Sequence, residues 1–132
     1  MPRDPGSPAA WLRYARSDLA LSKQSAAPGV LRETLCFHAQ QAVEKSVKAV
    51  LIHFGVAFPK VHSIERLIDL LPPGVARTDD LVAAGQLTAY ATIFRYPGEH
   101  EPVTEEQYRQ AVRLAEAGVV WAQEHLRADS VQ

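Results

Sequence analysis

The sequence predicts an all-α protein, a five-helix bundle whose long helices run up and down, with no sheet. Three observations lead to this prediction. Apolar residues recur at helical spacing in five segments, proline and glycine separate those segments, and no stretch alternates with the period of a strand. At 132 residues the chain suits one domain. We expect that domain over residues 9–128, with a lead-in at 1–8 and a tail at 129–132.

The first two helices follow from their apolar stripes. The first is expected to begin near Pro8, to bury a stripe from Trp11 to Ser22, and to end at Pro28–Gly29. The second has the longest stripe, from Leu31 to Phe54. Gly55 follows it as a left-handed C-cap.

Capping residues mark the other three helices. Ser63 is the expected N-cap of a short third helix, which Pro72 ends. The fourth is expected to begin near Thr78 and to continue to Pro97–Gly98. Thr104–Gln107 has the form of a capping box and starts the fifth helix, whose stripe ends at Leu126.

Composition limits the possible functions. Fourteen basic residues against 15 acidic ones give a formal net charge of -1, which excludes nucleic-acid binding through bulk charge alone. The single cysteine, Cys36, excludes an internal disulfide and a multi-cysteine zinc site, and we expect it to be buried. No apolar run is long enough to cross a membrane. We expect a cytoplasmic protein without a membrane anchor, metal or cofactor.

Four polar side chains of the second helix are spaced to project from one side. The structural interpretation is a solvent-exposed helix face supported by an i,i+4 pair between Glu44 and Lys48. The functional interpretation is a dimer interface or a surface beside a nucleotide site. The four residues are His38, Gln41, Lys45 and Lys48.

Four segments together resemble HEPN domains. They are Ala15–Leu19, Cys36–Ala49, His62 at the start of the third helix, and Ala91–Pro97 with its Arg-Tyr-Pro turn. Their order is that of the family, and they cover roughly residues 10 to 127. The resemblance implies a small helical bundle that forms homodimers. Many HEPN proteins are encoded beside a minimal nucleotidyltransferase and act as the toxin of a toxin–antitoxin pair. Active members are metal-independent ribonucleases, and others are nucleotide-binding or interaction modules.

The catalytic motif of the family is an arginine followed by four to six residues and a histidine. Arg95 and His100 fit with four residues between them, and Arg32 and His38 fit with five. The position at the end of the fourth helix favours the first pair. The sequence departs from active members at Tyr96, directly after the arginine, and at Pro102, where regulated members carry tyrosine. Pro97–Gly98 also puts a turn inside the motif.

The resemblance assigns roles to this pair that suit its chemistry. The guanidinium of Arg95 would bind a phosphodiester, and His100 would accept the proton of a ribose 2′-hydroxyl to leave a 2′,3′-cyclic phosphate. Tyr90 and Tyr96 would flank the cleft and stack on a base. The alternatives are a loop histidine, an arginine at a helix C-terminus, and tyrosines that pack. Asp18, near an apolar stripe, is either solvated or bonded to His38 or Arg95.

The leading functional prediction is a toxin-type ribonuclease, or a weakened remnant of one, that works with a partner nucleotidyltransferase. The alternative is a non-catalytic nucleotide-binding or interaction module that presents substrate to that nucleotidyltransferase. A structural dimer without a ligand is the third possibility. A neighbouring nucleotidyltransferase gene would favour the first two.

Overall fold

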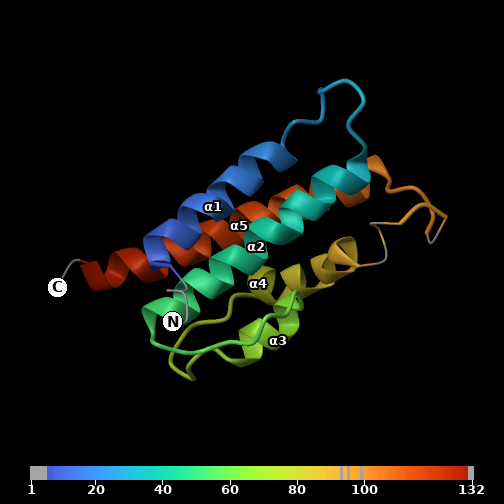
Figure 1. Cartoon of the computed structure of the whole chain (residues 1–132). Helices are drawn as coiled ribbons and strands as arrows, with labels where there is room; N and C mark the ends of the chain where they lie inside the picture. Colours follow the sequence, from blue (N-terminus) through green and yellow to red (C-terminus); the bar gives the residue numbers. More distant parts are fainter. Residues whose placement is uncertain (1–5, 93, 95, 99, 131–132) are drawn as a thin grey trace, which may run out of the picture.

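Helices make up all the regular secondary structure in the described part of the chain, which confirms the all-α prediction (Figure 1). The computed structural model describes residues 6–92, 94, 96–98 and 100–130, with the side chains of residues 128–130 excepted. In chain order the elements are α1 (Pro8–Ser22), α2 (Arg32–His53), α3 (Ile64–Asp69), α4 (Asp79–Ala83), the 3₁₀-helix η1 (Ala84–Ala91) and α5 (Glu105–Ser130).

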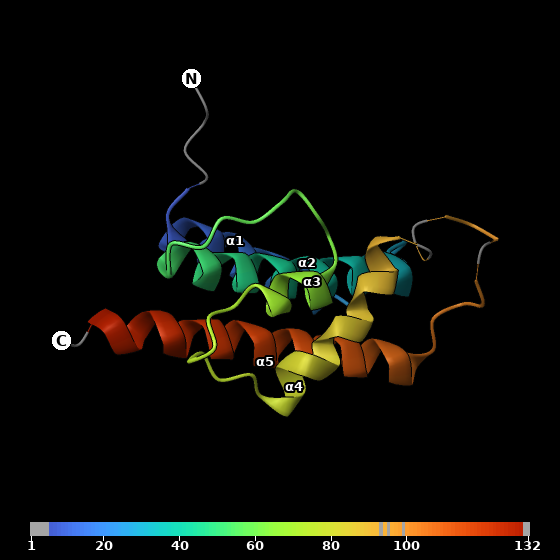
Figure 2. The ribbon, with the colours of Figure 1, turned by 90° about the horizontal axis from the view of Figure 1, so that it is seen from below.

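The three long helices lie side by side, and α2 is the central one. Figure 2 shows α1 and α2 in one layer and α5 in the next, with α3 and α4 along the side of the bundle. Helix α2 packs against α1, α5, η1 and α3, so it is covered on several sides. The core therefore surrounds α2, whose fully buried side chains include Val43, Val47 and Leu51.

The predicted caps are present where the sequence places them. Ser63 Oγ accepts from the backbone N–H of Arg66, and Thr78 Oγ1 accepts from that of Leu81. Thr104 and Gln107 form both bonds of the capping box, at 3.1 and 2.9 Å. Gly55 has φ of +71° directly after the C-cap of α2, a conformation that favours glycine.

The end of α1 differs from the prediction. The helix stops at Ser22, several residues before Pro28. The buried Ser22 donates its own hydroxyl to the carbonyl of Leu19 at 2.6 Å. Its carbonyl accepts a hydrogen bond from the hydroxyl of Tyr108, on α5, at 2.5 Å. A tertiary contact thus satisfies a carbonyl at the end of α1, and the residues before Pro28 form turns.

The fourth helix begins where the sequence predicts, but its geometry differs from the prediction. Only Asp79–Ala83 is α-helical, and the chain then winds as a 3₁₀-helix to Ala91. The spacing of the buried residues gives the reason, because a 3₁₀-helix superimposes residues three apart and an α-helix does not. The side chains that face the core at this spacing are Leu81, Ala84, Leu87 and Tyr90.

Candidate functional site

The candidate site is a hollow of about 480 Å³ at the end of the bundle where α2 begins. One wall comes from the start of α2 and the other from the segment between η1 and α5. We call it the histidine hollow because His38 and His100 both line it. The remaining lining residues are Leu31, Glu33, Thr34, Phe37, Phe94, Tyr96, Pro97 and Gly98. Arg95, the predicted phosphate-binding residue, lies outside the described residues.

His100 is held by its own segment. Its Nδ1 lies 2.6 Å from the backbone carbonyl oxygen of Glu101. A carbonyl oxygen only accepts, so this partner assigns the proton to Nδ1 and leaves Nε2 as the acceptor of the neutral ring. The ring also packs against Phe94, with 4.3 Å between the ring centroids. His100 therefore has a fixed orientation and a nitrogen available for proton transfer.

Asp18 is bonded rather than solvated, and one of its partners is His38. Its Oδ1 lies 2.9 Å from His38 Nδ1, and its Oδ2 accepts from Lys45 Nζ at 2.6 Å. The carboxylate is mostly buried, with 13% of its side chain exposed. Helix α1 thus supplies an anion that fixes two cationic or proton-bearing groups of α2.

The polar face predicted on α2 divides into two clusters. His38 and Lys45 belong to the Asp18 cluster. Lys48 instead donates to Glu44 at 2.9 Å, which confirms the predicted i,i+4 pair. The prediction that this pair is exposed to solvent is wrong. Lys48 is 7% and Glu44 3% exposed. Gln41 donates to the buried Gln40 at 2.7 Å.

Glu44 is the centre of what we call the Glu44 cluster, made of the buried Gln40, Glu44 and Lys48 and of the exposed His62 at its edge. Besides Lys48, Glu44 receives hydrogen bonds from Gln40 Nε2 and His62 Nδ1, each at 3.0 Å. Gln40 Nε2 also donates to the backbone carbonyl of His62. The Lys48 ammonium lies over the rings of Trp11 and Phe58, at 5.5 and 5.4 Å. Neither Gln40 nor Glu44 was among the predicted site residues. The sequence marked both only as neighbours of the polar face, and it marked Glu44 also by its i,i+4 spacing to Lys48.

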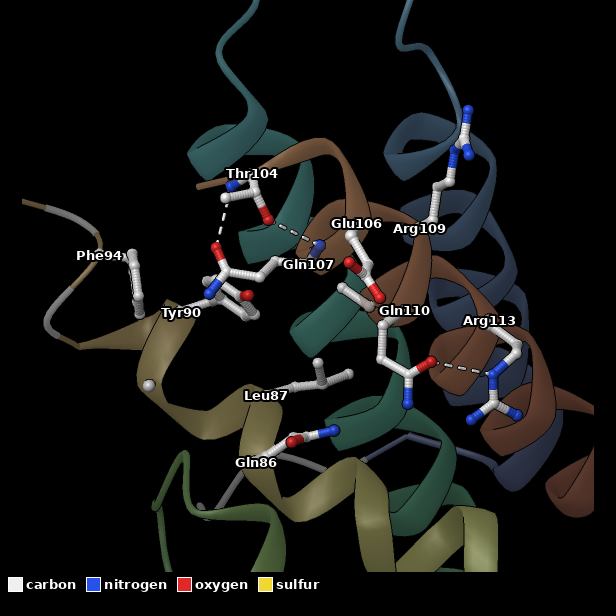
Figure 3. Close-up of a pocket in the computed structure, with 12 residues that line it drawn as sticks. Gln86, Leu87, Tyr90, Phe94, Thr104, Glu106, Gln107, Arg109, Gln110 and Arg113 are labelled. Carbon is white, nitrogen blue, oxygen red and sulfur yellow. Dashed lines mark hydrogen bonds between the residues drawn. The ribbon is translucent and has the colours of Figure 1, made fainter. Parts of the chain in front are cut away.

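The two predicted tyrosines border different hollows. Tyr96 lines the histidine hollow and is 59% exposed. Tyr90 is buried and lines a neighbouring groove of about 720 Å³ between η1 and α5. Figure 3 shows Leu87, Tyr90 and Phe94 on one side of this groove and glutamine and arginine side chains of α5 on the other. Phe94 lines both hollows.

Cys36 is fully buried, as predicted. Burial raises the pKa of its thiol to about 12, against a smaller lowering effect of the Tyr90 hydroxyl. Burial likewise raises the pKa of the Tyr90 hydroxyl to about 12.

We expect the thiol of the folded protein to be unreactive at pH 8, because only the thiolate attacks. A chromogenic disulfide should label Cys36 at least about a hundredfold more slowly in the native state than in urea, as followed by absorbance. Labelling at equal rates would show that Cys36 is not enclosed in the folded protein.

Metal-binding groups and membrane-spanning helices were searched for in the described residues. Among them, no three histidine, cysteine, aspartate or glutamate side chains are grouped so as to hold a metal ion. No helix in that part of the chain combines the length and apolar character that a membrane span requires.

The fold and the hollow define a small all-α bundle with polar residues at one end, and comparison with known proteins places it in a family. The family model described as "HEPN domain" matches residues 9–125. The chain therefore belongs to the HEPN family.

Two solved structures agree with this assignment. The crystal structure of TT1696 from Thermus thermophilus is 32% identical, with a TM-score of 0.78, over 89% of this chain and 97% of that one. The structure of ST0689, an archaeal HEPN homologue, is 25% identical, with a TM-score of 0.70, over 90% and 97%. A search of curated proteins found no match.

Proposed function

We propose that this protein cleaves RNA at the histidine hollow without a metal ion. The observation that carries the proposal is that two histidines, one on α2 and one in the segment before α5, line the same hollow. Aromatic side chains border the same hollow and are suited to stack on unpaired bases. They are Phe37, Phe94 and Tyr96.

The proposed reaction is an internal transesterification. Arg95 binds the phosphodiester through its planar guanidinium. Nε2 of His100 accepts the proton of the ribose 2′-hydroxyl, and the 2′-oxygen attacks phosphorus. The bond from phosphorus to the 5′-oxygen breaks, which leaves a 2′,3′-cyclic phosphate on one fragment and a 5′-hydroxyl on the other.

The test uses synthetic RNA and purified protein in EDTA. We expect cleavage with cyclic-phosphate ends, and a loss of at least about a hundredfold in His100→Ala and Arg95→Ala. Arg95→Lys keeps the charge but loses the bidentate fork, so its activity separates the two contributions. His125→Ala is the matched control, because His125 lies on α5 against Trp121 and does not line the hollow.

The opposite outcome is also informative. An inactive wild-type protein that still binds nucleotide would overturn the ribonuclease proposal. It would favour the non-catalytic module that presents substrate to a nucleotidyltransferase.

We also propose that the protein acts as a homodimer whose activity a nucleotidyltransferase partner restrains. Leu31 and Tyr96 line the hollow, and both are largely exposed in the single chain. Large exposed apolar side chains beside a site favour coverage by another protein. Sedimentation at micromolar concentration should give a dimer. A clean monomer there would contradict the homodimer.

A further inference from the structure

We propose that His38 is the general acid of the cleavage reaction, and that Asp18 is its positioning residue. This inference rests on the proposed ribonuclease function and adds a second proton-transfer group from the same chain. The site would then have an acid and a base in each protomer.

The geometry around His38 supports this role. Its Nδ1 is 2.9 Å from Asp18 Oδ1, and a carboxylate can only accept, so Nδ1 carries a proton. The ring lines the histidine hollow together with His100. Within the described residues Nε2 has no hydrogen-bond partner, which leaves it available to a ligand in the hollow. Asp18 thus binds one nitrogen and leaves the other for proton transfer.

Lys45 holds the Asp18 carboxylate in the orientation that positions the His38 ring. It donates to Asp18 Oδ2 at 2.6 Å, so each oxygen of Asp18 has its own donor. The ammonium carries only donors, so the oxygen facing it must be an acceptor. This constraint determines how the cluster responds to the substitution of Asp18 by asparagine.

The proton balance of the step is complete. His100 takes the proton from the 2′-hydroxyl as the 2′-oxygen bonds to phosphorus. The imidazolium of His38 gives its Nε2 proton to the 5′-oxygen as the bond from phosphorus to that oxygen breaks. His38 ends neutral, with Nδ1–H still donated to Asp18, and exchange with water restores both rings.

A substrate whose leaving group needs no proton separates the contribution of the general acid from that of the base. Nitrophenolate leaves without a proton, whereas a ribose 5′-oxygen needs one. We expect His38→Ala to lower the kcat for a uridine-containing dinucleotide by at least about a hundredfold. Its kcat for uridine 3′-(4-nitrophenyl phosphate) should change by less than about threefold. His100→Ala, which removes the base, should lose activity on both substrates.

Asp18→Asn tests the positioning role. The amide oxygen must face Lys45, so the amide N–H₂ faces His38 Nδ1 and leaves the imidazolium no acceptor there. We expect the same selective loss of kcat on the dinucleotide as in His38→Ala, with KM nearly unchanged. The ¹⁵N shifts of the ring should show Nδ1 unprotonated in the neutral form.

A double variant provides the rescue. In Asp18→Asn with Lys45→Met the amide is free to turn its oxygen to His38, so both the protonated Nδ1 and the activity should return. Asp80→Asn is the matched control, because Asp80 forms an exposed ion pair with Arg113 and does not line the hollow. Thermal melts identify any variant that has lost its fold, and His38→Gln then replaces His38→Ala.

The outcomes separate the two proposals. Equal losses of His38→Ala on both substrates, or no loss on either, would overturn the acid role while RNA cleavage by the wild type stands. Full activity and an unchanged ring in Asp18→Asn would overturn the positioning role. A wild-type protein inactive on both substrates would overturn the ribonuclease function and this inference with it.

Discussion

Replacing Glu44 by alanine is expected to lower the free energy of unfolding by about 3–5 kcal/mol. The Glu44 carboxylate accepts from Gln40, Lys48 and His62, and it is almost completely buried. Its removal leaves the buried Lys48 ammonium without a counter-charge, which costs more than the pair itself contributes. Urea unfolding followed by circular dichroism measures the change.

An exposed pair of the same kind is the matched control. Arg109 donates to Glu105 at 2.8 Å with the same i,i+4 relation, but both side chains are mostly exposed. Glu105→Ala should cost less than about 0.5 kcal/mol. Adding Lys48→Met to Glu44→Ala should recover part of the loss, because it removes the unpaired charge. Equal losses in Glu44→Ala and Glu105→Ala would contradict the burial of the Glu44–Lys48 pair.

Replacing Trp121 by alanine is expected to cost about 3–5 kcal/mol. The indole of Trp121 is buried, and its Nε1 donates to the backbone carbonyl of Ala76 at 2.8 Å. The truncation leaves a cavity on α5 and an unpaired carbonyl in the loop before α4. Urea unfolding with a circular dichroism readout is again the measurement.

A smaller change at the same position separates packing from hydrogen bonding. Trp121→Phe keeps an aromatic ring but loses the donor, so it should cost about 1–2 kcal/mol, mainly from the carbonyl of Ala76. A Trp121→Ala variant as stable as the wild type would show that this indole does not join α5 to the loop before α4.

Local signals in the sequence predicted most helix starts, whereas tertiary contacts set the rest. Ser63, Thr78 and Thr104 cap helices through bonds to residues three positions away, so the sequence contains all that those caps need. The end of α1 depends on Tyr108, which is 86 residues away from Ser22. The sequence around Pro28 gives no sign of that contact, so it could not show where α1 ends.

The sequence predicted only three site residues among those that line the histidine hollow, His38, Tyr96 and His100, and it did not predict how the polar side chains would group. Helical spacing put His38 and Lys48 on one polar face of α2. Because α2 has helices on several sides, much of that face meets protein rather than water, and Lys48 is buried with Glu44. The pairing of Asp18 with His38 was one of several alternatives in the sequence, and only the packing of α1 on α2 selects it.

The winding of η1 determines what reaches the histidine hollow. A 3₁₀-helix rises about 2.0 Å per residue and an α-helix about 1.5 Å, so the eight residues of Ala84–Ala91 advance the chain about 4 Å farther than α-helical winding does. They also accumulate about 160° of additional rotation, at 120° instead of 100° per residue. With α-helical winding, the end of η1 would lie closer to α4 and would face another direction. The aromatic wall of the hollow therefore depends on helical pitch as well as on residue type, and an insertion in η1 would disrupt it without altering any lining residue.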